Sequence, residues 1–309
     1  MKSTRPYRFA LATAAALIAL TGCTSASQAL ETGTSTSGAA SFDPAAVAKD
    51  DALAALVPAN IKNKGTLTVG SDTTFAPAEY LGGADGQTPM GFDVDFAKAI
   101  AATLGLKLQF QTAEFTSILP ALGPKYDLGI SAFSITNERL KAVNFVDYYR
   151  AGSIWAVQKG NPKSVSLDSL CGRKVGVQTG TVQENPDLSG RSKACTDAGK
   201  PAIDVISLPN QTDITTRLVA GGIDAMVSGS TAVTYALTQT HGQLQLLGDL
   251  YNPDDTGIAV AKSDPQFADL IAKVMNKLIA DGSYAKIMDS WNMSVLSVKT
   301  SVVNPEANR

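Results

Sequence analysis

Arg139 has the clearest potential for binding chemistry in this sequence. It comes three residues after Thr136, which is placed to cap the start of a short helix. A guanidinium held there can grip a carboxylate through two parallel N–H groups. The sequence therefore predicts a carboxylate-binding arginine, with an ordinary surface arginine as the alternative.

Ser131 and Ser134 stand at and just beyond the end of a predicted strand, Asp127–Ser131. In open α/β sheets, ligands bind outside the carboxyl ends of parallel strands, so these hydroxyls are candidate ligand contacts. Serines in loops also bond to nearby backbone groups and make local turns. The sequence leaves both interpretations open.

Composition excludes several other kinds of chemistry. The chain has 309 residues, 26 basic against 28 acidic side chains, a formal net charge of −2 and a single His. Nucleic-acid binding needs a clustered basic surface, and a near-neutral balance argues against it. One His excludes a His-rich metal site and argues against a His-based catalytic triad. At about 100–200 residues per domain, the length predicts about two domains.

The middle of the chain alternates strands and helices, which predicts a parallel sheet covered by helices. Asp93 is expected to cap a helix that Gly105 ends. The first set of expected elements comprises Thr66–Ser71, Val94–Leu104, Leu106–Gln111, Ser117–Leu122 and Asp127–Ser131.

The same rhythm restarts further along the chain, so a second α/β unit is expected. Pro186 predicts a short or broken helix after the first strand of this unit. Apolar runs at Ser153–Val157 and Gly257–Ala261 are placed where the chain can cross between the units, which predicts a cleft that opens and closes. The expected elements are Arg173–Val177, Ile203–Ser207, Asp213–Ala220, Ile223–Val227, Thr231–Thr240, Pro265–Ala280 and Tyr284–Trp291.

The first 23 residues have the pattern of an export signal rather than of a folded element. Basic residues precede an apolar run, Phe9–Leu20, that is too short to span a bilayer. The following Leu20-Thr21-Gly22-Cys23 resembles the lipobox of bacterial lipoproteins, which implies cleavage after residue 22 and lipid on Cys23. A plain cleaved signal is the alternative. Residues 24–41 are mostly Ser, Thr, Gly and Ala, a flexible-linker composition, and we expect the linker to extend over 23–59.

Cys171 and Cys195 lie 24 positions apart. In an exported chain such a pair favours a disulfide, with two buried free thiols as the alternative. No second pair of Cys or His accompanies them, which argues against a metal site.

Four motifs together resemble the family 3 solute-binding proteins, the polar amino-acid receptors of ABC importers. The resemblance runs from about Lys64 to Trp291 and implies a two-lobed periplasmic-binding-protein type II fold. Each lobe is then a mostly parallel α/β sheet flanked by helices, and two hinge strands join the lobes. The implied boundaries are 60–155 with 258–309 for the first lobe and 156–257 for the second. The motifs are Val69–Pro77, the G-F-D-x-D of Gly91–Asp95, the S-I-T-x-x-R of Ser134–Arg139, and Gly282–Tyr284 with Trp291.

The resemblance also implies a ligand site. Arg139 matches the arginine that holds the ligand α-carboxylate, Phe75 and Phe115 match aromatic residues on either side of the ligand, and Asp72 matches a contact to its side chain. A local turn cap is the equal alternative for Asp72, core packing is the alternative for each Phe, and an ordinary strand-to-helix turn is the alternative for Gln178–Val182. The remaining implied contacts are Ser131, Ala132, Phe133, Ser134, Gln178, Thr181, Val182, Ser228 and Gly229.

Two positions depart from the family pattern. Gly229 stands where relatives carry an Asp that accepts from the ligand's α-ammonium, and Thr256 where they usually carry an aromatic residue. A buried ammonium without its anion is costly. The departure implies that Asp72 or the serines at 228 and 230 substitute, that the ligand lacks a primary α-ammonium, or that affinity is modest.

The family implies a receptor that captures a polar amino acid or similar small solute and delivers it to an ABC permease. We expect an exported monomer, lipid-anchored on the outer face of the cell membrane, with no cofactor, metal or nucleic-acid partner. One alternative is an enzyme of the same fold, such as a cyclohexadienyl dehydratase, with Asp72 or Glu79 in acid–base roles. Another is a ligand sensor that does not transport.

Overall fold

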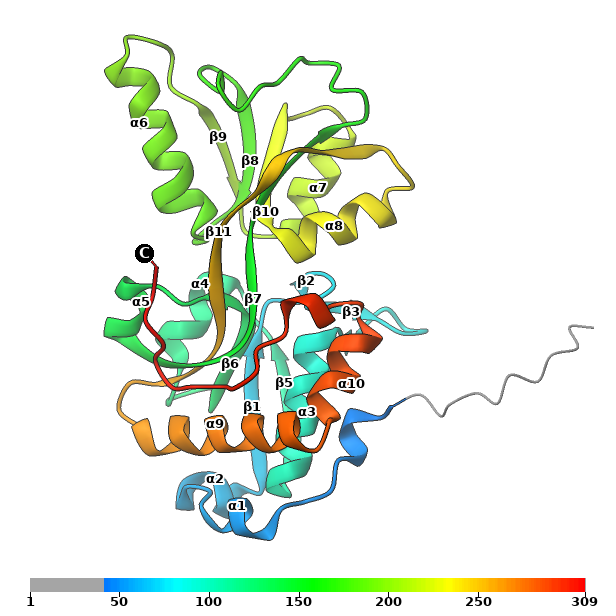
Figure 1. The fold of residues 1–309 in the computed structure, drawn as a ribbon, viewed down its shortest axis with the longest axis vertical. Helices are drawn as coiled ribbons and strands as arrows, with labels where there is room; N and C mark the ends of the chain where they lie inside the picture. The colour runs from blue at the N-terminus through cyan, green and yellow to red at the C-terminus, as the bar shows by residue number, and fades with distance from the viewer. Residues whose placement is uncertain (1–41, 309) are drawn as a thin grey trace, which may run out of the picture. The chain divides into compact units, whose positions relative to one another are not determined.

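One mixed sheet of eight strands runs through residues 42–308, the part of the chain that this computed structural model describes (Figure 1). The strand order is β5-β1-β6-β11-β7-β10-β8-β9. The bounds are β1 Thr66–Ser71, β5 Lys107–Thr112, β6 Leu128–Ser134, β7 Val143–Gln158, β8 Lys174–Gln178, β9 Asp204–Leu208, β10 Ala225–Gly229 and β11 Leu244–Ala261.

Two groups of parallel strands are joined by two long antiparallel strands. In the first lobe β1 pairs parallel with β5 and β6, and in the second lobe β8 pairs parallel with β9 and β10. Between them β7 and β11 pair antiparallel along most of their length. At about 3.3 Å per residue, strands of 16 and 18 residues are long enough to belong to both lobes. The predicted two-lobed α/β fold with two hinge strands is confirmed.

Helices cover both parallel groups, as Figure 1 shows. Those of the first lobe are α3 Phe92–Leu104, α4 Phe115–Ile118, η2 Leu119–Ala121, α5 Asn137–Ala142, α9 Pro265–Ala280, α10 Ser283–Ser290 and η4 Ser294–Leu296. Those of the second are η3 Gln183–Leu188, α6 Ser189–Asp197, α7 Gln211–Val219 and α8 Ser230–Gln239. As Pro186 predicts, η3 is kinked, because Asn185 has non-helical dihedrals. Among the described residues, no helix is long and apolar enough to cross a membrane.

A small sheet and an N-terminal segment were not expected from the sequence. β2 Thr74–Phe75, β3 Glu79–Gly82 and β4 Thr88–Met90 form an antiparallel sheet that follows β1. Part of the predicted linker, 23–59, is folded instead, from Phe42 onward. η1 Pro44–Ala46, α1 Asp51–Ala55 and α2 Ala59–Lys64 lie before β1, and the Asp50 N–H donates to the Thr103 carbonyl of α3 (2.9 Å). Cys23 and the predicted signal lie outside the described residues.

The start of α3 differs from the expectation. The helix begins at Phe92 and its N-cap is Gly91, so Asp93 is not the cap. Gly91 has φ 126°, and an added Cβ would lie 2.1 Å from the Ala78 carbonyl oxygen, which only glycine tolerates. Asp93, the second residue of the helix, is fully buried.

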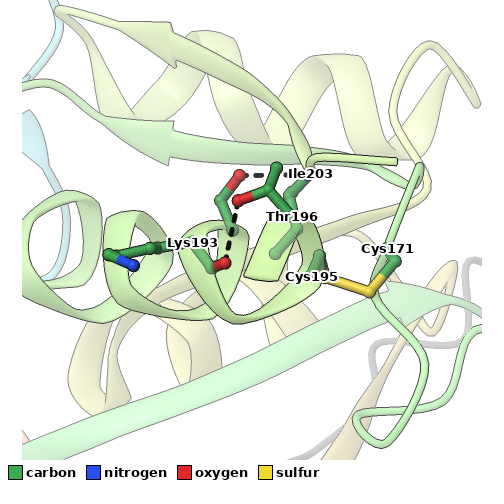
Figure 2. Close-up of a disulfide and its surroundings, with 6 residues drawn as sticks. Cys171, Lys193, Cys195, Thr196 and Ile203 are labelled. Carbon is green, nitrogen blue, oxygen red and sulfur yellow. Dashed lines mark hydrogen bonds between the residues drawn. A yellow bond between two sulfur atoms is a disulfide. The ribbon is translucent and has the colours of Figure 1, made fainter. Parts of the chain in front are cut away.

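Cys171 and Cys195 are joined by a disulfide with a Cα–Cα distance of 5.5 Å (Figure 2). The bond ties the loop before β8 to α6, and Cys195 is buried in the second-lobe core. A cross-link closing a loop of this length stabilises the folded state by roughly 3 kcal/mol in the chain-entropy model.

The C-terminal segment lies along the first-lobe part of β7. Val303 and Ser297 pair with Val146 and Tyr149, and the Val302 N–H donates to Asp147 Oδ1. Burial raises the pKa of Asp147 to about 6, and the nearby Asp255 carboxylate adds to the shift. In the unfolded chain the pKa is 3.8, so the folded state binds its proton more tightly.

We predict that Asp147→Asn stabilises the protein at pH 7. The wild-type side chain contributes stability below pH 3.8 that is lost as pH rises through about 6. Asn cannot ionise, and its Oδ1 still accepts from Val302. The expected gain at pH 7 is about 1 kcal/mol, reduced from the full linkage value by solvent screening. Urea unfolding at pH 5 and pH 7.5 measures it, and an equal loss of stability at both pH values would contradict it.

Candidate functional site

A cavity of about 40 Å³ lies where the carboxyl ends of β6 and β8 face each other. It is lined by both lobes and by both hinge strands. The described lining residues are Phe75, Phe115, Ser131, Ala132, Ser134, Arg139, Tyr149, Ala151, Gly152, Gln178, Thr181, Val182, Gln183, Gly229, Thr231 and Thr256. Most of the residues expected from the sequence are therefore brought together at one place.

Arg139 is held from several sides. Its own N–H donates to the Thr136 hydroxyl (3.1 Å), which is the predicted cap of α5. Its Nη1 donates to the Ser134 carbonyl (2.8 Å) in its own lobe, and its Nη2 donates to the Gly180 carbonyl (3.1 Å) in the other. The guanidinium therefore contacts both lobes at once.

Aromatic rings support the same guanidinium. Its carbon lies 5.5 Å from the ring centre of Phe115 and 5.7 Å from that of Phe133. The two rings are stacked with centroids 4.8 Å apart. Phe115 lines the cavity, whereas Phe133 is fully buried behind it. The structure thus places Phe133 as support for Arg139 rather than in the cavity wall.

A buried carboxyl group positions the backbone near the carboxyl end of β6. Ala132 has φ 47°, a conformation that non-glycine residues rarely adopt. Its N–H donates to Asp93 Oδ2 (3.0 Å), and the Tyr148 hydroxyl donates to Asp93 Oδ1 (2.6 Å). Asp93, an element of the G-F-D-x-D motif, therefore holds the cavity wall in place.

Ser131 is engaged by a second buried carboxyl group. Its hydroxyl donates to Glu79 Oε1 (2.6 Å) and accepts the Asp72 N–H (3.0 Å). Burial raises the pKa of Glu79 well above its ordinary value, and the neighbouring Asp93 raises it further. The Ser131 hydroxyl is therefore engaged inside the protein both as a donor and as an acceptor.

Asp72 does not line the cavity. It is 3 % exposed, and its Oδ1 accepts from the Thr74 N–H (3.1 Å) and hydroxyl (2.8 Å), the local cap that the sequence left open. Its Oδ2 accepts from Gln178 Nε2 (2.6 Å), across the lobes. Burial raises the pKa of Asp72. The structure thus gives Asp72 a role in joining the lobes.

The second lobe presents the end of β8 and the following turn. Thr181 donates its hydroxyl to the Gln178 carbonyl (2.8 Å), and the Gly180 N–H donates to Glu184 Oε2 (2.6 Å). Gly180 has φ 78°, and a Cβ there would lie 2.5 Å from Cγ2 of Thr116 in the first lobe. Glycine is required here by both the turn and the close approach of the lobes.

Gly229 ends β10 and faces an aromatic ring. A Cβ on Gly229 would lie 3.3 Å from Phe75 Cζ. The neighbouring Ser228 is 3 % exposed and donates to Gln211 Oε1 (2.9 Å), so it stands behind the wall. Of the expected contacts, Asp72, Phe133 and Ser228 are thus near the cavity without lining it.

The hinge strands supply lining residues that the sequence analysis missed. Tyr149, Ala151 and Gly152 come from β7, because this strand starts ten residues before the apolar run that predicted the crossing. Thr256 comes from β11, and Gln183 and Thr231 from the starts of η3 and α8. The sequence signal that could have revealed the residues of β7 is the continuous strand pattern that begins at Val143.

Comparison with known proteins identifies the family. Residues 67–294 match the family model described as bacterial extracellular solute-binding proteins, family 3. The chain belongs to this family. A relative named arginine-binding protein ArgT, from Corynebacterium glutamicum, is 30% identical over 258 residues, which cover 82% of this chain and 83% of the relative.

Solved structures of family members have the same fold. A mutant of ArgBP from T. maritima matches with a TM-score of 0.68 at 30% identity, over 75% of this chain and 97% of that one. An ancestral arginine-binding protein bound to arginine matches with a TM-score of 0.66 at 35% identity, over 74% and 98%. The chain therefore has the two-lobed fold of amino-acid-binding receptors.

We predict that Gln178→Ala shifts this protein toward an open arrangement of its lobes. The change removes the Nε2 donor from a buried carboxylate, which costs about 1–3 kcal/mol in the state where the lobes meet. Small-angle scattering is expected to report a larger radius of gyration for the variant. Gln158→Ala is the matched control, because Gln158 Nε2 donates to the Val219 carbonyl (3.0 Å) within the second lobe and does not join the lobes through that contact. An unchanged radius in Gln178→Ala would contradict the role.

Proposed function

We propose that this protein is an exported receptor that captures an amino acid or an amino-acid-like solute between its lobes. The observation that carries the proposal is the guanidinium of Arg139, set in the cavity wall and bonded to carbonyl oxygens of both lobes. A carboxylate could replace these carbonyls as the acceptor, with a stronger, charge-assisted pair. Relatives named for arginine, lysine or histidine binding support a ligand of amino-acid type.

Lobe closure is the physical step that makes capture selective. The contacts Asp72–Gln178 and Arg139–Gly180 form only when the lobes meet, as does the bond from the Gln211 N–H to the Thr74 hydroxyl (3.3 Å). A ligand that touches both lobes binds the closed state better and so shifts the population toward it. The hinge strands β7 and β11 provide the two connections about which the lobes turn.

The cellular setting belongs to the same proposal. We infer that the signal, 1–22, is removed and that lipid on Cys23 tethers a monomer to the outer face of the cell membrane. The closed receptor then docks on an ABC permease. The proposed lobes are 60–155 with 258–309, and 156–257.

Geometry favours binding over turnover. If the protein were an enzyme, Asp72 and Glu79 would be the candidate acid and base. Both are buried and hydrogen-bonded within the protein, and neither lines the cavity. A general acid or base must reach the proton it transfers, directly or through one water. Their placement supports a structural role for both.

We predict that at least one carboxylate solute in an amino-acid and amino-acid-analogue screen raises the thermal midpoint of the wild-type protein. A ligand at one hundred times its Kd adds about 2.7 kcal/mol to stability. Arg139→Ala is expected to abolish the shift, because the carboxylate loses its charged partner. Arg217→Ala, an exposed arginine on α7, is the control and keeps it. A shift that survives in Arg139→Ala would contradict the assignment.

We predict that Cys23→Ser moves the exported protein from the membrane fraction to the soluble fraction. Without the thiol no lipid can be attached, and the apolar chains that hold the protein at the surface are lost. Cell fractionation with labelled fatty acid measures this directly. The double variant Cys171→Ser/Cys195→Ser is the control and stays with the membrane. Equal soluble fractions for wild type and Cys23→Ser would rule out the anchor.

A further inference from the structure

The described residues that line the cavity carry one full charge, that of Arg139. Tyr149 is also titratable, but burial raises its pKa well above the ordinary value, so it is neutral at physiological pH. The other lining residues have hydroxyl, amide, aromatic or aliphatic side chains, or none. The wall therefore offers a ligand one cation and no carboxylate.

Two carboxyl groups behind the wall, those of Asp72 and Glu79, are hydrogen-bonded within the protein. Both Oδ atoms of Asp72 accept hydrogen bonds, from Thr74 and Gln178, and the group is 3 % exposed. Glu79 is fully buried behind Ser131, whose hydroxyl donates to it. Neither can reach a ligand without breaking buried hydrogen bonds, which would leave buried polar groups without partners and is unfavourable.

At Gly229 the wall consists of bare backbone and an aromatic ring. The Cα–Cβ direction of this residue points at Phe75 Cζ, 3.3 Å from where the Cβ would lie. An amine brought to this side of the cavity meets the Phe75 ring and the hydroxyl-bearing wall instead of an anion. A zwitterion pairs its carboxylate with Arg139 but leaves a buried ammonium unpaired, which is unfavourable.

Building on the proposed function, we propose that the cleft selects carboxylates that carry no free primary α-ammonium. The class includes N-acylated amino acids and 2-hydroxy or 2-oxo acids. Arg139 grips the carboxylate, the rings of Phe75 and Phe115 enclose the neighbouring carbon, and Gly229 leaves the α-substituent without a counter-ion. Gly229 is thus the residue that sets this specificity.

Matched ligand pairs test the proposal by calorimetry on the mature chain. The probes are L-leucine, N-acetyl-L-leucine and 2-hydroxyisocaproate, L-glutamine with N-acetyl-L-glutamine, and L-arginine with Nα-acetyl-L-arginine. In each set that binds, the blocked or deaminated member is expected to bind at least tenfold more tightly. A free amino acid that binds as tightly as its analogue, or more tightly, overturns the inference and leaves the proposed function standing. Silence from every probe overturns both.

Gly229→Asp tests the residue itself, with Gly229→Asn as a neutral control of the same size. The carboxylate is expected to improve binding of the free amino acid at least tenfold and to weaken binding of its N-acetyl partner, whereas Asn does neither. Equal behaviour of the two variants overturns the role of charge at this position. If the Phe75 ring prevents both variants from folding, the wild-type ligand pairs still decide the proposal.

Discussion

The guanidinium of Arg139 is the interaction on which the rest of the cleft depends. The capped start of a short helix positions it, and its carbon lies 5.5 Å from the centre of the Phe115 ring. It also donates to one backbone carbonyl in each lobe. A cation in a small enclosed space needs an acceptor, and here backbone carbonyls from two lobes provide it. The guanidinium therefore has two roles: it helps to hold the lobes together, and it presents N–H donors to a ligand carboxylate.

Buried acids make this arrangement rigid without entering the cavity. Asp93 fixes the left-handed backbone at Ala132, Glu79 holds Ser131, and Asp72 reaches across to Gln178. Burial raises the pKa of all three carboxyl groups, because a buried carboxylate loses its hydration. The acids thus serve the scaffold, and the wall in front of them keeps a single positive charge.

Much of the fold follows from local pattern. β1 and α9 have the predicted bounds. The sequence of β1 alternates apolar with small polar residues, and α9 has Pro at its first turn and Gly shortly after its end, so both are strongly marked. The hinge strands were recognised only in part, since their outer halves pair through long-range partners that local periodicity does not reveal. The small sheet β2-β3-β4 was missed because its strands have only two to four residues, which is too short for a periodic pattern to show.

The motif residues correctly located the ligand cavity, but the sequence did not show which of them line the cavity and which lie behind its wall. Asp72 and Ser228 sit one layer back because their side chains find partners in the folded protein, Gln178 and Gln211, that are distant in sequence. Asp93 was expected to cap a helix, but the cap is Gly91, and the Asp93 side chain instead accepts from Ala132 and Tyr148, which are distant in sequence. A crystal structure of the protein with a retained ligand tests the central claim most directly. The account predicts a ligand carboxylate in a bidentate pair with Arg139, at about 2.7–2.9 Å. A ligand bound between the lobes without contact to Arg139 would contradict it.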